Sequence, residues 1–277
     1  MKNVFASATT LKLYADHFNI GWQNKLCKFP NNRIAILLLS SNDNRVDSIF
    51  IEEYIPEYQS IFDIKNLPIL SSSLKNMTIP NCLMDEKFRD CFKLKSLAVT
   101  KFVINGFQYL KFCCKTDLLE FSSDFGIDQF FSDLDYLESS QYSPHLSSVK
   151  QITFNGCFFE QRFNLKCDKL MDCFSSIEIF KFNLTKPSFY RSTEFCHSYF
   201  SCLLKRNIKL FIDDIKKATH VSPKINVTEV GFLDFNNCKF ICKNFDANES
   251  ITDFYCFKKT IKSAGSESTV LEIQVAR

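Results

Sequence analysis

Cysteine and histidine are the residues of this chain whose types could support nucleophilic or metal chemistry. Their only close local grouping is Cys196-His197 with Cys202. A thiol beside an imidazole can form a catalytic nucleophile, so an enzyme with a Cys/His site at Cys196 and His197 is the alternative hypothesis for this chain. Cys113-Cys114 is a bare pair, and Cys238 and Cys242 are separated by three residues. Zinc sites show doubled, tighter spacing, so we expect no metal site.

Other catalytic motifs do not occur in the sequence. It contains no phosphate-binding loop of the G-x-x-x-x-G-K-S/T type, no G-x-G-x-x-G, no H-E-x-x-H and no G-x-S-x-G. Each of these motifs places glycines or ligands where a phosphate, a metal or an exposed nucleophile needs them. We therefore predict a protein that is not an enzyme, with no catalytic residues, no cofactor and no small-molecule substrate.

Composition narrows the class of partner and the compartment. The net charge of +3 is too small to indicate nucleic-acid binding, and no run of 18 apolar residues predicts a membrane span. Thirteen cysteines follow an N-terminus without an apolar signal core. Reduced thiols in the cytoplasm or nucleus are the expected state of such cysteines.

A recurring frame dominates the chain: an apolar residue, two spacers, an apolar residue, one spacer, an apolar residue, two spacers, and often Cys. Strict copies are Leu74..Met77.Ile79..Cys82, Leu94..Leu97.Val99..Phe102, Val149..Ile152.Phe154..Cys157 and Val230..Leu233.Phe235..Cys238. Looser copies begin at Leu118, Ile177, Asn207, Ile251 and Ser268, and further copies begin at Ala8, Ile34 and Val46. The spacing of most copies lies near 20–29 residues, which is typical of leucine-rich repeats.

Each copy predicts a short strand whose fourth and sixth positions point inward. The frame therefore predicts burial of Met77, Ile79, Leu97, Val99, Ile152, Phe154, Phe180, Phe182, Leu210, Ile212, Leu233 and Phe235. Cysteine at position nine is expected to be a small packing residue in the turn that follows the strand. Helical returns between strands are expected at 190–205 and 165–174, where apolar residues share one face.

The frame resembles the consensus strand of the leucine-rich-repeat superfamily, nearest to its irregular, Cys-containing class. That resemblance implies an α/β fold: a curved solenoid with a parallel sheet on the concave face and short helices or loops on the convex face. It covers most of residues 74–277. We expect a single domain over 1–277, in which 1–73 is an N-terminal cap or a set of degenerate repeats. Ribonuclease-inhibitor-like proteins and the substrate-binding halves of F-box proteins carry similar repeats.

The resemblance implies a non-catalytic scaffold that binds a polypeptide partner on its concave face, with ubiquitin-ligase substrate adaptor as the sharper version. The spacer residues of that face run from basic in the early strands to more acidic in the later ones, which suits a partner of opposite charge. Aromatic spacers are the best anchors because aromatic residues dominate interface energetics. The candidate contact residues are Phe232, Asp234, Asn236, Tyr255, Lys75, Lys95, Lys101 and Lys150.

Overall fold

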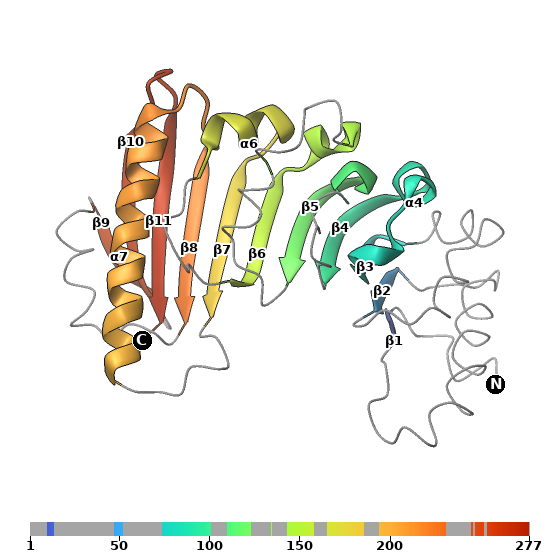
Figure 1. Cartoon of the computed structure of the whole chain (residues 1–277), viewed down its shortest axis with the longest axis horizontal. Helices are drawn as coiled ribbons and strands as arrows, with labels where there is room; N and C mark the ends of the chain where they lie inside the picture. The colour runs from blue at the N-terminus through green and yellow to red at the C-terminus, as the bar shows by residue number, and fades with distance from the viewer. Residues whose placement is uncertain are drawn as a thin grey trace. The chain divides into compact units, whose positions relative to one another are not determined.

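The chain forms an α/β fold with a mostly parallel sheet and few helices, as the sequence predicts (Figure 1). The computed structural model describes residues 10–13, 47–51, 74–100, 110–122, 134, 143–157, 165–185, 194–230, 245, 247–251 and 254–276. Two compact units make up the chain. Unit 1 comprises Met1–Leu119 with Ser143–Leu146, and unit 2 comprises Glu120–Tyr142 with Ser147–Arg277.

Unit 1 is built on parallel strands that pair in chain order. These are β1 (Thr10–Leu13), β2 (Ser48–Ile51), β3 (Asn76–Pro80) and β4 (Lys93–Thr100). The short helices η2 (Asn81–Leu83) and α4 (Glu86–Cys91) join β3 to β4. β5 (Lys115–Ser122) begins in unit 1 and ends in unit 2, and η5 (Pro144–Ser148) is divided in the same way.

Unit 2 begins with parallel strands and ends with antiparallel ones. Its elements are β6 (Gln151–Cys157), α6 (Cys167–Cys173), β7 (Ile179–Thr185), α7 (Glu194–Lys217), β8 (Lys224–Val230), β9 (Ala247–Ile251), β10 (Phe254–Lys262) and β11 (Ser268–Ala276). The strand order is β6-β7-β8-β11-β10-β9. β11 pairs with β8 in parallel, whereas β10 runs antiparallel to both β11 and β9.

The register of the strands follows the repeated frame. In unit 1 the fourth positions align as Leu11, Ile49, Met77 and Leu97. In unit 2 the fourth positions Ile152, Phe180 and Leu271 align with Ile225 of β8. Burial is confirmed for eight of the inward positions expected from the frame: Met77, Ile79, Leu97, Val99, Ile152, Phe154, Phe180 and Phe182. The frame therefore specifies both the pairing register and the core face of these strands.

A hydrogen-bond pattern also recurs at the second position of the frame. The carbonyl oxygen of Asp47 accepts from the backbone N–H groups of Lys75 and Asn76, at 2.7 and 2.9 Å. In the next pair of strands, the Lys75 carbonyl accepts in the same way from the N–H groups of Lys95 and Ser96, at 2.6 and 3.2 Å. In unit 2 the carbonyl of Lys150 accepts from two successive N–H groups of its neighbour, at 2.7 and 3.2 Å. The same local geometry thus opens several strands.

Three expected strands need correction. The copy that begins at Asn207 lies inside helix α7, where Leu210 and Ile212 are only half-buried. The copy that begins at Ile251 contributes to the antiparallel strand β10 and is therefore not a parallel repeat strand. β5 follows a frame two residues earlier than the expected copy at Leu118, since its inward residues are Leu119 and Phe121.

Strand β8 has no counterpart among the expected copies. Its inward residues are Ile225 and Val227, which pair with Phe180 and Phe182 of β7. The copy at Ile34 lies outside the described residues. So does the copy at Val230 after its first residue, including Leu233 and Phe235. The side chains of Cys82, Cys157 and Cys238 also lie outside the described part.

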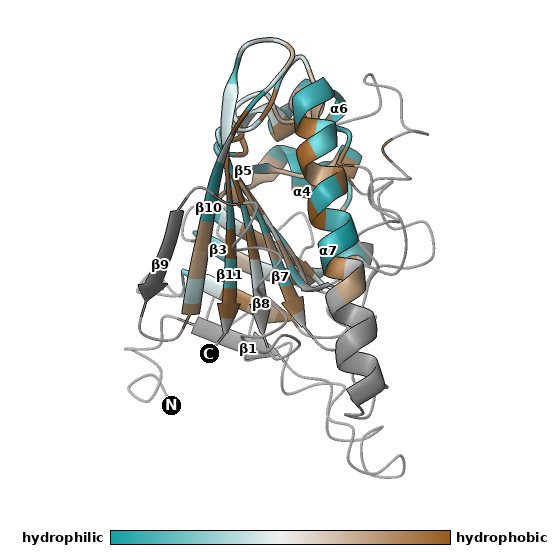
Figure 2. Ribbon diagram, turned by 90° about the vertical axis from the view of Figure 1, so that its left-hand side faces the viewer, coloured by the Kyte–Doolittle hydropathy of each residue, from teal (hydrophilic) through white to brown (hydrophobic). Residues whose placement is uncertain are grey.

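The core of unit 2 lies between its strands and its helices. Figure 2 shows α6 and α7 on one side of the strands of this unit. The ring of Phe211 in α7 lies 5.6 Å from that of Phe182 in β7, centroid to centroid. Phe154 and Phe182 stack at 5.3 Å and are nearly parallel. Because side chains alternate along a strand, the residues directly before and after Phe154 and Phe182 face the opposite side of the sheet.

Candidate functional site

The expected contact residues are divided between the two units. Lys75 and Lys95 are exposed at the start of β3 and just inside β4 in unit 1, and Lys150 is exposed immediately before β6 in unit 2. The backbone N–H of Lys95 donates to the carbonyl of Lys75, so these two residues are neighbours. The remaining candidates apart from Tyr255 lie outside the described residues: Lys101, Phe232, Asp234 and Asn236.

Tyr255 does not lie on the expected face. It pairs with Val275 across the antiparallel strands β10 and β11, and Val275 shares its side of the sheet with Ile273 and Leu271. These residues belong to the buried face on which α7 packs. Directly paired residues point to the same side, so Tyr255 is directed toward the helix side of the sheet. The pairing register of β10 on β11 thus turns Tyr255 away from the open face on which it was expected.

The other side of the unit 2 sheet carries polar side chains. We call this surface the polar face; its residues are Gln151, Thr153, Asn155, Lys181, Asn183, Lys224, Asn226, Thr228, Glu272, Gln274, Cys256 and Lys258. Most of them are half-buried, as expected for side chains flanked by neighbouring strands. Among the described elements of unit 2, both α-helices lie on the opposite side (Figure 2). The described α-helices of this unit therefore leave the polar face uncovered.

Amide side chains connect the first strands of the polar face. The Nδ2 group of Asn183 donates to Oδ1 of Asn155 at 2.6 Å, and Nδ2 of Asn155 donates to a carboxylate oxygen of Glu120. Burial raises the pKa of Glu120, and the hydrogen bond from Asn155 opposes that shift. Successive amides on adjacent strands thus pass hydrogen bonds in one direction across the sheet.

A second cluster of polar contacts surrounds Glu272, which is 6% exposed. Its two oxygens accept from Lys224 Nζ at 3.0 Å and from Gln274 Nε2 at 2.6 Å. Burial alone would raise the pKa of Glu272, but these donors hold it below its usual range. Thr228 donates its hydroxyl to Oε1 of Gln274 at 3.3 Å. Glu272 is therefore an ionised and locally neutralised group rather than a free charge.

Between the two clusters lies Asn226, whose Oδ1 is buried and has no hydrogen-bond partner among the described residues. Asn226 pairs in register with Lys181 on one side and Glu272 on the other. A buried acceptor without a partner costs free energy, so such an atom in a native protein needs an explanation. It marks the centre of the polar face as a place where a donor is missing.

Alternation along the strands also accounts for three N-x-T triplets in the sequence. Asn76-Met77-Thr78 lies in β3, Asn183-Leu184-Thr185 in β7 and Asn226-Val227-Thr228 in β8. In each triplet a buried apolar residue separates two polar ones. Residues two apart share one side of a strand, so Asn and Thr on the same polar side give the N-x-T triplet. The triplets therefore need no glycosylation to explain them.

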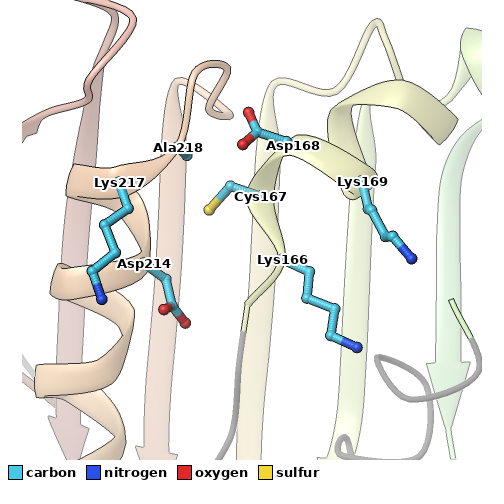
Figure 3. A pocket seen from close by; sticks show the side chains of 7 residues that line it. All are labelled: Lys166, Cys167, Asp168, Lys169, Asp214, Lys217 and Ala218. Carbon is cyan, nitrogen blue, oxygen red and sulfur yellow. The ribbon is translucent and has the colours of Figure 1, made fainter. Parts of the chain in front are cut away.

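A cavity of about 400 Å³ lies in unit 2 between the start of α6 and the end of α7 (Figure 3). It is lined by Lys166, Cys167, Asp168, Lys169, Asp214, Lys217 and Ala218. Its carboxylates have structural partners. Asp168 Oδ1 accepts from the backbone N–H groups of Thr219 and His220, both at 2.8 Å, and Asp214 Oδ2 accepts from that of Leu165 at 3.0 Å. These contacts join α6 and α7 to the segments beside them.

The thiol in this cavity is a poor nucleophile. Burial raises the pKa of Cys167 to about 12, and the nearby carboxylates of Asp214 and Asp168 raise it in the same direction. Thiol nucleophiles act as thiolates, which a neutral solution would not generate at such a site. Burial likewise raises the pKa of Cys114 in unit 1 to about 12. The carboxylates of the cavity thus connect neighbouring segments by hydrogen bonds, and its cysteine is not activated.

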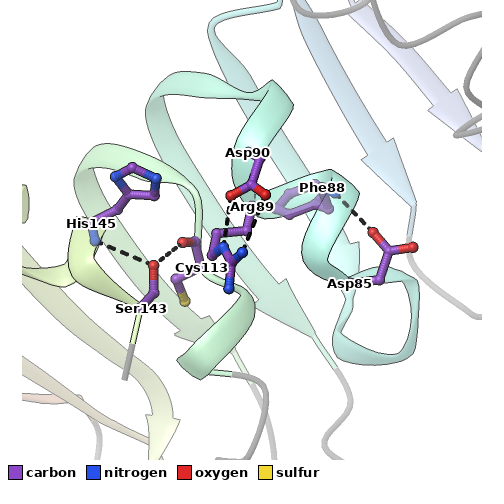
Figure 4. Close-up of polar contacts among 7 residues, drawn as sticks. All are labelled: Asp85, Phe88, Arg89, Asp90, Cys113, Ser143 and His145. Atoms are coloured by element: carbon purple, nitrogen blue, oxygen red, sulfur yellow. Dashed lines mark hydrogen bonds and ion pairs between the residues drawn. The ribbon is translucent and has the colours of Figure 1, made fainter. Parts of the chain in front are cut away.

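Serine, histidine and aspartate also lie near one another in unit 1 (Figure 4). The hydroxyl of Ser143 donates to the carbonyl of Cys113 at 2.6 Å and accepts from the backbone N–H of His145 at 3.2 Å. Asp90 forms a bidentate pair with Arg89, at 2.7 and 3.1 Å. A catalytic triad needs the hydroxyl on the imidazole and the imidazole on the carboxylate. The Ser143 contacts instead anchor the turn that begins η5, and Asp90 pairs with its neighbour in α4.

The Cys196 and His197 pair lies in the first turn of α7, and the description of that turn does not extend to its side chains. Cys202, further along the same helix, is exposed and free. In the part of the chain that the structure describes, no three of the side chains that bind metals gather into a possible metal site. Within the same residues, no helix is long and apolar enough to span a membrane.

Comparison with known proteins identifies no relative: no family model, curated protein or solved structure matches this chain. The functional site is therefore assigned from geometry. Of the contact residues expected from the sequence, Lys150 lies immediately before β6, beside the polar face. Sequence reasoning did not name Asn155, Asn183, Asn226 or Thr228 among them. The signal that could have found Asn155, Asn183 and Thr228 is the recurrence of Asn or Thr one residue after the second buried position of a strand, as in Asn155 after Phe154. Asn226 lies between the two buried positions Ile225 and Val227 of β8, a strand that the frame did not predict.

Proposed function

We propose that this chain is a non-catalytic interaction scaffold of the leucine-rich-repeat type, which binds a polypeptide partner on the polar face of unit 2. The observation that carries the proposal is the polar face itself. Five paired strands present hydrogen-bonding side chains there, while the described α-helices of the unit, α6 and α7, lie on the other side. Repeat proteins bind partners on extended surfaces of this kind, built from equivalent positions of successive strands.

The repeat assignment is supported by the recurring frame, by the alignment of fourth positions in both units, and by the double-acceptor pattern at position two. The antiparallel β9, β10 and β11 depart from a regular repeat and would form its C-terminal end. The sharper version of the proposal is a ubiquitin-ligase substrate adaptor, by analogy with the substrate-binding halves of F-box proteins. That analogy concerns the repeats alone.

Affinity capture followed by mass spectrometry tests this function. The bait is the full chain, compared with a variant N183L/T228V, in which two polar-face groups lose their hydrogen bonds at similar side-chain size. The matched control is K75A/K95A, which alters exposed lysines in unit 1. We expect a discrete partner that the full chain and the control retain and the polar-face variant loses. Recovery of ubiquitin-ligase subunits would support the adaptor version, and equal recovery by all three baits would move the site elsewhere.

The enzymatic alternative predicts a different result with a thiol-reactive probe. A catalytic Cys196 would react much faster than the exposed Cys202 on the same helix, because an activated thiolate forms beside an imidazole. The scaffold proposal expects no such selectivity. Rapid, selective labelling of Cys196 that disappears in a variant H197A would contradict the scaffold and favour the enzyme.

A further inference from the structure

The polar face has a central row of uncharged groups that crosses four strands. Asn155, Asn183, Thr228 and Gln274 align in register on β6, β7, β8 and β11. We call these four residues the amide row. Neighbouring strands lie roughly 4.8 Å apart, so the row repeats at that interval. Asn155 and Asn183 are hydrogen-bonded to each other, and so are Thr228 and Gln274. These bonds fix the orientation of the row before any partner arrives.

Both carboxylates beside the amide row have hydrogen-bond donors, and one of them pairs with a lysine. Glu272 is bonded to Lys224 and to Gln274, and Glu120 accepts from Asn155. The charges nearly balance, since the polar face carries Lys181, Lys224, Lys258 and Glu272, and Glu120 of β5 lies beside it. Such a surface offers little electrostatic attraction to a strongly charged partner. The charge gradient expected from the sequence is therefore absent from the centre of this face.

Amide groups both donate and accept hydrogen bonds, as a peptide group does. The row therefore presents mixed donors and acceptors to whatever lies on it. Beside the row, the unpartnered Oδ1 of Asn226 adds an acceptor that needs a donor. Rotation about the terminal torsion of an asparagine exchanges its oxygen and nitrogen at modest cost, so this acceptor can turn toward a bound group. A partner that supplies a donor there removes the free-energy cost of the unsatisfied atom.

We infer that the amide row recognises an uncharged polar segment of the partner polypeptide, rich in Ser, Thr, Asn or Gln. This inference rests on the proposed function, because it names the chemistry of the partner at the same site. Hydroxyl and amide side chains donate and accept as the row does, and they supply the donor that Asn226 lacks. An acidic or basic segment would instead leave its charges without counterions on this part of the face.

Pools of short peptides of defined composition test the inference on the full chain. One pool is rich in Ser, Thr, Asn and Gln, a second in Asp and Glu, and a third in Lys and Arg. We expect the full chain to bind the uncharged pool most tightly. Its affinity should change less than about twofold between ~0.05 M and ~0.5 M salt, because screening acts on charges and hardly on neutral hydrogen bonds.

Two variants connect that binding to the row. N183L/T228V removes two hydrogen-bonding groups and should weaken the uncharged pool by roughly tenfold or more, as expected for the loss of two such bonds. T260V removes an exposed hydroxyl on β10 outside the row and should leave binding unchanged. Circular dichroism and thermal unfolding establish that both variants fold.

The outcomes separate the inference from the function on which it rests. Tighter binding of a charged pool, or binding that salt weakens more than tenfold, overturns the uncharged-partner inference while leaving a polypeptide-binding scaffold. Binding of the uncharged pool that N183L/T228V leaves intact overturns the role of the amide row. Failure of every pool to bind counts against polypeptide binding itself, and therefore against the proposed function.

Discussion

Aromatic rings form a continuous stack through the core of unit 2, from Phe121 through Phe154 and Phe182 to Phe211. The expected copy at Leu118 places Phe121 at an inward position but takes the buried Leu119 for a spacer, because it aligns the frame on Leu118 instead of Thr116. Thr116 is 1% exposed, and its hydroxyl donates to the carbonyl of Leu118 at 2.9 Å. A hydrogen-bonded threonine thus occupies a position where the frame calls for an apolar residue, and composition alone cannot reveal that bond.

The central ring of the stack should carry a large share of the stability of unit 2. Phe182→Ala removes a fully buried ring that contacts both Phe154 and Phe211. We expect a loss of about 3–5 kcal/mol in the free energy of unfolding, from lost burial and the cavity left behind. Urea unfolding measures it, with Glu178→Ala at an exposed site as the control. A loss below about 1 kcal/mol would contradict the stacked core.

Glu267 should make the stability of unit 2 depend on pH. The Val221 N–H donates to its Oε2 at 2.8 Å, and its Oε1 lies 3.2 Å from His220 Nδ1. The Val221 N–H and then the His220 side chain lower the pKa of Glu267. A carboxylate with a lowered pKa in the folded state stabilises the fold above its unfolded pKa, about 4.3. That contribution disappears as the pH falls through the lower, folded value.

The variant E267Q tests this dependence. It should be less stable than the original chain at neutral pH, and the two should converge as the pH falls below about 4.3. Thermal unfolding over a pH series shows the difference, and E178Q shows the effect of losing an exposed carboxylate. A constant difference at every pH would mean that the Glu267 charge has no part in holding the segment before β8.

At the scale of elements, helix α7 shows why a short apolar pattern can mislead. The segment from Asn207 satisfies the strand frame through Leu210 and Ile212, yet it continues the helix to Lys217. The buried residues of this helix, Leu204, Ile208, Phe211 and Ile215, recur every three or four residues. Over the longer window the helical period fits better, and the helix packs on an adjacent sheet. The expected helix was correct in place but too short.

Two substitutions distinguish the helix from the strand. Phe211→Ala should cost about 3–5 kcal/mol, because the ring is 1% exposed and contacts Phe182. Leu210→Ala, on the half-buried flank, should cost clearly less, about 1 kcal/mol. Chemical unfolding of both variants measures the two losses in the free energy of unfolding and so distinguishes a helix from a strand. A larger loss for Leu210→Ala than for Phe211→Ala would favour the strand.

Helix α4 has only six residues, so its first turn needs an efficient cap. Asp85 is the N-cap and accepts from the backbone N–H of Phe88 at 2.8 Å (Figure 4). Asp85→Ala should reduce the free energy of unfolding of unit 1 by about 0.5–2 kcal/mol. Asp85→Asn, which keeps an accepting oxygen, should recover most of that loss. If both variants lost the same amount, the charge of Asp85 rather than its hydrogen bond would stabilise the helix.

At the scale of the whole molecule, the sequence predicted the α/β class and the register of most parallel strands. It did not predict the antiparallel end of unit 2. The turn between β10 and β11 contains Gly265, where an added Cβ would lie 1.9 Å from the Thr219 carbonyl oxygen. Ser266 beside it has a positive φ of 70°. A turn of this kind between two alternating segments indicates a hairpin. The repeat frame instead predicted β10 and β11 as two separate parallel strands, so the hairpin was missed.

The central claim is that the polar face of unit 2 binds the partner. A photoreactive amino acid in place of Lys181, which lies on the polar face outside the amide row, tests it on the purified chain mixed with the partner recovered by affinity capture. The same residue in place of Lys216, exposed on α7, is the control. We predict cross-linking from position 181 and little from position 216. Cross-linking from position 216 alone, with the variants folded, would contradict the claim and place the partner on the helix side.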